Sequence, residues 1–140
     1  ASLDLIVVDA FTSDAIPTHL MTREAIELYF DRLTPSGKVV LHLSNRYIDL
    51  LPVVAAIASD LGVEGYFQDY SPDKAAADQG GFASRWVVLM EESPANRVAK
   101  DLDRWRQLPP SSAAVWTDDY SNVVGQIMWR NLLSEIDVYE

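Results

Sequence analysis

The hydrophobic positions of this chain fall into short continuous runs separated by stripes with helical spacing. Four runs rich in β-branched or aromatic residues predict strands, at residues 5–8, 38–43, 65–70 and 85–90. The first run is apolar throughout, which is typical of a strand buried on both faces of a parallel sheet. A polar stretch without helical spacing, residues 71–81, separates the last two runs. We therefore expect these two strands to form an antiparallel hairpin around a mobile loop.

Stripes of apolar residues recurring every three or four positions indicate helices between and after the strands. Four helices are predicted, at residues 22–33, 49–61, 93–108 and 122–135. Thr22 and Asp49 are suited to cap the first two of these helices, and Gly62 is the natural stop of the second.

This order of elements predicts the α/β class. Alternating strands and helices favour a parallel sheet with right-handed crossovers, here completed by the antiparallel hairpin. Such a hairpin is unusual for the dinucleotide-binding fold and typical of the S-adenosylmethionine-dependent methyltransferase fold. We therefore expect residues 1–140 to form a single domain with a partial doubly wound, Rossmann-like sheet of methyltransferase type.

Composition excludes several classes of protein. A chain that is 49% hydrophobic is not disordered, and no apolar run approaches the roughly 18 residues that span a bilayer. The absence of cysteine excludes disulfides and zinc–thiolate sites. A net charge of −10 argues against a nucleic-acid surface and would attract a cationic ligand, although solubility alone also explains acidity. We expect a cytoplasmic protein without membrane contact.

Candidate functional residues follow the first two strands. Asp9 ends the first strand, and Asp14 lies in the loop after it. Asn45 and Tyr47 come directly after the second strand. Ligands of open α/β sheets bind outside the carboxyl ends of the strands, so these side chains are candidates for one cleft. The alternatives are a solvated carboxylate for Asp9, a turn cap for Asp14 and simple packing for Tyr47.

A polar turn near the C-terminus carries three more candidates. Asp118, Asp119 and Tyr120 could complete a pocket for an ammonium group, or an Asp there could cap a following helix. The chain has two histidines. We expect His42, flanked by leucines, to be a hydrogen-bonded buried residue rather than a catalyst, and His19 to lie exposed in the loop. Neither has a partner at metal-ligand spacing, so no metal is predicted.

Three segments carry a resemblance to a known family. They are Asp4-Leu5-Ile6-Val7-Val8-Asp9 followed by Ser13-Asp14 and Pro17, Val40-Leu41-His42-Leu43-Ser44-Asn45-Arg46-Tyr47, and Trp116-Thr117-Asp118-Asp119-Tyr120. Together they resemble spermidine synthase and related bacterial proteins, some of which are fused to membrane segments. The resemblance runs across nearly all 140 residues and corresponds to the second half of the family's catalytic domain.

The resemblance implies aminopropyl transfer from decarboxylated S-adenosylmethionine to putrescine or a related amine, with release of methylthioadenosine. By position, Asp9 corresponds to the family's general base, and Asp14 to the carboxylate that holds the substrate amine. The family's usual loop places the second Asp three residues after the first. Here the spacing is five residues, which weakens the correspondence of Asp14 more than that of Asp9.

The glycines do not form a nucleotide-binding turn. No Gly-x-Gly follows a strand and opens a helix in these 140 residues. We therefore expect a substrate-side half, with no cofactor in this chain, that is inactive by itself. The alternatives are a non-catalytic binding or dimerisation module derived from this fold, or a methyltransferase relative. A half-sheet exposes the flank of its first strand, residues 5–8, so we also expect a homo-oligomer.

Overall fold

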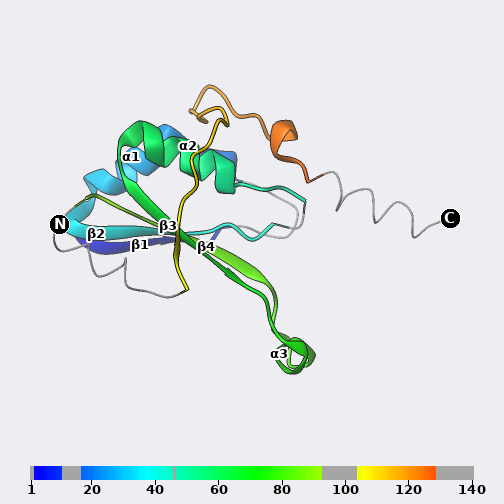
Figure 1. Ribbon diagram of the computed structural model, residues 1–140. Helices are drawn as coiled ribbons and strands as arrows, with labels where there is room; N and C mark the ends of the chain where they lie inside the picture. Colours follow the sequence, from blue (N-terminus) through cyan, green and yellow to red (C-terminus); the bar gives the residue numbers. More distant parts are fainter. Residues whose placement is uncertain (1, 11–16, 46, 93–103, 129–140) are drawn as a thin grey trace.

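The computed structural model describes residues 2–10, 17–45, 47–92 and 104–128. The strands are β1 (Leu3–Val8), β2 (Leu33–His42), β3 (Glu64–Tyr70), β4 (Ser84–Met90) and β5 (Arg106–Gln107). The helices are α1 (Arg23–Asp31), α2 (Leu51–Leu61) and α3 (Lys74–Asp78), with 3₁₀ turns at Thr18–Leu20 and Val124–Gln126. The five strands form one sheet, and α1 and α2 lie together over one of its faces (Figure 1). The α/β class is therefore confirmed.

The sheet is mostly antiparallel, and its strand order is β1-β2-β4-β3-β5. Only β1 and β2 pair in parallel, joined through α1. The expected hairpin of β3 and β4 is present, but β4 inserts between β2 and β3 and runs antiparallel to both. The expectation of a sheet built from adjacent parallel strands thus holds for one pair. Because β1, β2 and β3 still run in the same direction, their carboxyl ends meet at the same edge of the sheet.

The main core lies between the sheet and the two long helices. Side chains alternate across each strand, so every second residue of the sheet faces α1 and α2. The buried strand residues of this layer are Val8, Val39, Leu41, Phe67, Val87 and Leu89. Helix α2 is buried along most of its length, and the fully buried Trp116 joins the same cluster. This layer holds the strand ends in place.

The opposite face of β1 is not covered by the described chain. Leu3, Leu5 and Val7 are 48%, 53% and 53% exposed, whereas Val8 on the helix side is buried. The prediction of a strand buried on both faces is therefore wrong for β1. Its apolar run continues on a face that no described helix covers, and β1 is also an edge strand of the sheet.

The predicted Thr22 cap of α1 and Gly62 stop of α2 are confirmed, but α1 ends at Asp31 rather than at residue 33, because β2 begins at Leu33. Thr22 caps α1, accepting a hydrogen bond from the backbone N–H of Ala25 at 3.2 Å. The cap residue of α2 is Leu50 rather than the predicted Asp49, which lies one residue earlier and accepts a hydrogen bond from the N–H of Leu51. Gly62 ends α2 in the left-handed conformation, with φ of 68°, which glycine adopts without strain.

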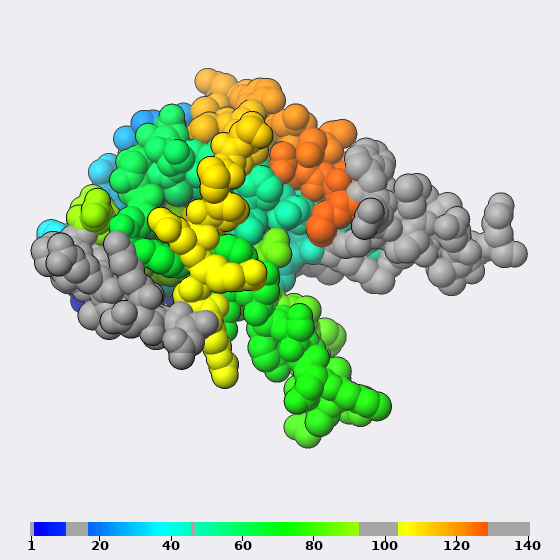
Figure 2. All heavy atoms as spheres, in the orientation of Figure 1, coloured from blue at the N-terminus to red at the C-terminus, as the bar shows by residue number. Residues whose placement is uncertain are grey.

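The polar stretch at residues 71–81 is more ordered than the expected loop. It contains α3, which Asp73 caps through the N–H of Ala76 at 2.8 Å. Three consecutive alanines favour a helix by intrinsic propensity even though they form no apolar stripe. Figure 2 shows the hairpin and α3 projecting from the body of the molecule.

The C-terminal third differs from the prediction. Residues 93–103 lie outside the described residues, and Trp105 is followed by β5, which pairs with β3, rather than continuing a helix. Of the predicted helix at 122–135, the described part forms only the 3₁₀ turn at Val124–Gln126. In the described part of the chain, no helix has the length and apolar character needed to cross a membrane.

Candidate functional site

Asp9, His42 and Trp86 form a row across three strands at the carboxyl edge of the sheet. Val8 is in register with Leu41, so Asp9 follows beside His42, and His42 is in register with Trp86. Val8 and Leu41 face the helices, and the alternation of side chains turns the row to the opposite, more open face. The register of two strand pairs therefore brings together residues far apart in the sequence.

Asp9 and His42 are directly paired. The Nδ1 atom of His42 lies 2.7 Å from Oδ1 of Asp9. The Asp9 side chain is 55% exposed and that of His42 is 21% exposed. The expected hydrogen bond of His42 is present, but its side chain is partly exposed rather than buried, and its partner is the carboxylate that the sequence marked as the candidate base. Asp9 therefore presents an accessible carboxylate that is held from one side.

The imidazole of His42 is fixed on its other side by Trp86. The two rings stack with centroids 4.4 Å apart and planes inclined by 17°. The Nε2 atom of His42 is buried and has no hydrogen-bond partner among the described residues. The ring can therefore reach a polar partner only through Nδ1, which faces Asp9.

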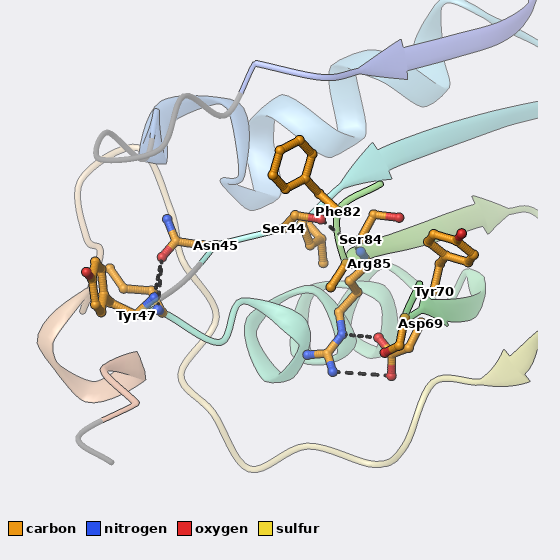
Figure 3. A pocket seen from close by; sticks show the side chains of 12 residues that line it. Ser44, Asn45, Tyr47, Asp69, Tyr70, Phe82, Ser84 and Arg85 are labelled. Atoms are coloured by element: carbon orange, nitrogen blue, oxygen red, sulfur yellow. Dashed lines mark hydrogen bonds and ion pairs between the residues drawn. The ribbon is translucent and has the colours of Figure 1, made fainter. Parts of the chain in front are cut away.

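A cavity of about 870 Å³ opens past the ends of β2 and β3 (Figure 3). Its polar and aromatic lining comprises Ser44, Asn45, Tyr47, Asp69, Tyr70, Ser71, Phe82, Ser84 and Arg85. Phe82 and Tyr70 are 83% and 44% exposed, so two large rings at the cavity are unburied. A cavity of this size with mixed lining falls in the range of small-molecule sites. Asp9 and His42 are not among the described residues that line it.

Arg85 organises the polar wall of the cavity. Its guanidinium donates to Asp69 at 2.6 Å and to Asp49 at 2.9 Å, joining β4 to β3 and to the start of α2. Arg106 adds a second cation on Asp69 at 2.8 Å. The hydrogen bond from Arg85 holds the pKa of Asp69 below its ordinary value, and the pKa of Arg85 is raised by the same contact. The charged forms of Asp69 and Arg85 are therefore favoured, and their opposite charges largely neutralise each other.

Asn45 and Tyr47, both predicted from sequence, line the cavity (Figure 3). The side-chain oxygen of Asn45 accepts hydrogen bonds from the backbone N–H groups of Tyr47 at 2.9 Å and Ile48 at 3.0 Å. This turn explains why an Asn follows the strand: its side chain replaces a backbone acceptor and reverses the chain toward α2. The role of either residue in binding stays a prediction.

The turn at Asp118, Asp119 and Tyr120 packs against the start of α1. Oδ1 of Asp118 accepts a 2.7 Å hydrogen bond from the Thr22 hydroxyl, and its backbone N–H donates to Glu24. Thr117 and Tyr120 close the turn through a pair of backbone hydrogen bonds. None of these residues lines the described cavity, so their membership of a cation pocket stays a prediction.

Two further expectations concern Asp14 and metals. Asp14 lies outside the described residues. Within residues 2–10, 17–45, 47–92 and 104–128, no three acidic or histidine side chains gather as they would around a metal ion.

Sequence reasoning missed the salt-bridge cluster and the His42–Trp86 stack. A signal for the cluster existed: a hairpin of 65–70 with 85–90 can set Asp69 opposite Arg85, two opposite charges in a cross-strand pair. The stack had no such signal, because it depends on β4 inserting next to β2.

Comparisons with protein-family models, with curated proteins and with solved structures find no match to this chain.

Proposed function

We propose that this chain forms the amine-binding part of an aminopropyl-transfer site of the spermidine synthase type. In this proposal the Asp9 carboxylate holds a substrate ammonium and accepts its proton. The observation that carries the proposal is the accessible carboxylate of Asp9 at the carboxyl end of β1, hydrogen-bonded to His42 at 2.7 Å. Such a group binds a primary ammonium well, because a charge-assisted hydrogen bond to a carboxylate is among the stronger polar contacts.

The chemistry needs a proton acceptor at that point. The ammonium of putrescine first gives a proton to Asp9, which leaves a nitrogen lone pair. That nitrogen then forms a bond to the propyl carbon next to the sulfonium of decarboxylated S-adenosylmethionine. The carbon–sulfur bond breaks, its electron pair neutralises the sulfur, and methylthioadenosine leaves. The product carries the positive charge on a secondary ammonium. A positioned general base contributes about 10²–10⁴-fold to such a step.

Two features of the fold support the proposal. Asp9 lies at the strand edge where ligands of open α/β sheets bind. The parallel pair β1–β2 followed by an antiparallel hairpin agrees with the methyltransferase-type sheet expected from sequence. The net charge of −10 favours a cationic ligand.

Calorimetric titration with putrescine tests the proposal on the chain itself. We expect saturable binding by the wild type and at least roughly tenfold weaker binding by Asp9→Asn, which keeps the shape but loses the charge. Asp31→Asn is the matched control. This substitution changes the net charge by the same amount. Asp31 precedes Arg32, whose carbonyl accepts from the N–H of Leu3 at the start of β1, so Asp31 lies at the opposite end of the strand from Asp9. Equal weakening in both variants, or no putrescine binding at all, would overturn the proposal.

A second candidate is a module that pairs with a copy of itself through β1. The exposed residues Leu3, Leu5 and Val7 favour it, together with the edge position of the strand. Antiparallel pairing with Ile6 opposite Ile6 sets Leu5 of one copy opposite Val7 of the other. In the same register Asp4 faces Val8 and Asp9 faces Leu3, so no two carboxylates lie opposite each other. The segment can therefore pair with a copy of itself.

A further inference from the structure

The short contact with Asp9 favours one tautomer of His42. At 2.7 Å, a lone pair on Nδ1 would face the lone pairs of a carboxylate oxygen, which is repulsive. The contact therefore favours the tautomer in which Nδ1 carries the proton and donates it to Oδ1 of Asp9. The buried Nε2, without a partner in the described part of the chain, offers the ring no competing hydrogen bond.

The imidazole is more firmly held than the carboxylate that it contacts. His42 is the last residue of β2, which is paired with β1 on one side and with β4 on the other, and its ring is stacked on Trp86. Asp9 lies just beyond the end of β1, and its side chain is more exposed than that of His42. The hydrogen bond thus transfers the rigidity of the sheet to an otherwise loosely held side chain.

We infer that His42 is a positioning residue: its Nδ1–H engages Oδ1 of Asp9 and leaves Oδ2 free to hold the substrate ammonium and take its proton. This inference rests on the proposed function. Groups of a site act best when neighbouring hydrogen bonds fix their geometry before the ligand arrives. His42 does not touch the substrate in this arrangement, because its remaining ring nitrogen is buried.

Three substitutions separate the donor from the ring. His42→Asn keeps an N–H at about the place of Nδ1 but loses the ring. His42→Phe keeps a ring to stack on Trp86 but loses the donor. His42→Gln keeps an amide but moves it beyond the Nδ1 position. This variant replaces His42→Phe as the one without a donor if the Phe variant does not fold. Thermal unfolding of each variant shows which ones are folded.

The first measurement needs no ligand. Ring ¹⁵N chemical shifts distinguish a protonated nitrogen from one with a lone pair, and His19→Gln removes the only other histidine signal. We expect a protonated Nδ1 in the His42 ring and a clear change of its shifts in Asp9→Asn. A His42 ring with its proton on Nε2 alone, or shifts insensitive to Asp9→Asn, overturns the inference.

The second measurement is putrescine titration of the same variants. We expect roughly three- to tenfold weaker binding by His42→Phe or His42→Gln, the size of one ordinary hydrogen bond, and nearly wild-type binding by His42→Asn. Rescue by Asn is the result that a merely structural role of the ring would not produce. Wild-type affinity in His42→Phe or His42→Gln overturns the inference and leaves the proposed function standing. Loss in all three variants also overturns it, because the ring rather than the donor would then matter.

Absence of putrescine binding by the wild type overturns the proposed function and, with it, the binding role of His42. The ring nitrogen shifts then still show whether the hydrogen bond to Asp9 exists. The two failures are therefore distinguishable.

Discussion

The hydroxyl of Thr22 donates a 2.7 Å hydrogen bond to Asp118, a residue 96 positions further along the chain. The same hydroxyl caps α1 by accepting from the N–H of Ala25, and the next residue, Arg23, donates its N–H to the carbonyl of the buried Trp116. The start of α1 is therefore built jointly by two distant segments. The turn that the sequence marked as a candidate cation pocket has a structural role at this point.

Thr22→Val is expected to lower the free energy of unfolding by about 1–2 kcal/mol, because it removes the cap and the bond to Asp118 together. Asp118→Ala removes only the hydrogen bond to Thr22 and should lower the free energy of unfolding by about 0.5–1 kcal/mol. Urea denaturation measures both. Asp119→Ala, one residue on and exposed, is the control and should stay within about 0.5 kcal/mol of wild type. If Asp118→Asn weakens putrescine binding at unchanged stability, the turn belongs to the amine site after all.

Asp69 makes stability depend on acid pH. Its folded-state pKa is lowered from the ordinary value of 3.8, chiefly by the hydrogen bond from Arg85. A depressed carboxyl pKa contributes stability that is fully present above the ordinary value and is lost as the pH falls through the lower, folded value. The gap in unfolding free energy between wild type and Asp69→Asn should therefore be constant near neutral pH and shrink below about pH 3.8.

Urea denaturation at a series of pH values measures this gap, with Asp31→Asn as a variant of equal charge change. A gap that widens as the pH falls would contradict the assignment of the Asp69–Arg85 pair as the cause.

The exposed edge of β1 should drive self-association if the second candidate function is correct. Light scattering would then give a mass above the 15.6 kDa of one chain for the wild type, and Leu5→Lys should return the protein to that mass. Leu28→Lys on α1 is the control, since Leu28 is 51% exposed and Leu5 is 53% exposed. A wild type that remains a monomer at high concentration rules out pairing through β1.

Gly65 allows Leu108, just after β5, to lie close against β3. A Cβ atom at Gly65 would collide with Cδ1 of Leu108, whose N–H donates to the Gly65 carbonyl at 2.9 Å. Gly65→Ala should cost about 1–3 kcal/mol through overpacking. In Leu108→Ala the obstructing side chain is absent, so the same glycine substitution should cost less. A double-mutant cycle by urea denaturation measures this coupling, and strictly additive effects would show that the clash is relieved elsewhere.

The sequence predicted local features well where a single segment determines them. Thr22 and Gly62 bound their helices as expected, because capping hydrogen bonds and left-handed glycine are properties of a few adjacent residues. The β3–β4 hairpin also followed from local pattern. The short helix α3 was missed because its evidence is alanine propensity and the Asp73 cap rather than an apolar stripe.

In the candidate site, too, the features set by local sequence could be predicted and those set by contacts between strands could not. That Asp9, Asn45 and Tyr47 follow strands at one edge could be predicted, because strand direction and the position of a residue after a strand are visible in the sequence. The pairing of Asp9 with His42 needed the register of β1 against β2, and the stacking on Trp86 needed β4 beside β2. Apolar runs in a sequence indicate where strands form, but they do not indicate which strands pair with each other.

By itself, the sequence determined the α/β class, the two long helices, the hairpin and an acidic group at the end of the first strand. The tertiary structure alone decided the strand order, the exposure of one face of β1, and the grouping of Asp9, His42 and Trp86. The physical reason is that periodicity and capping are set by residues within a few positions of each other. Register, burial and side-chain pairing instead depend on the free energy of contacts between segments tens of residues apart.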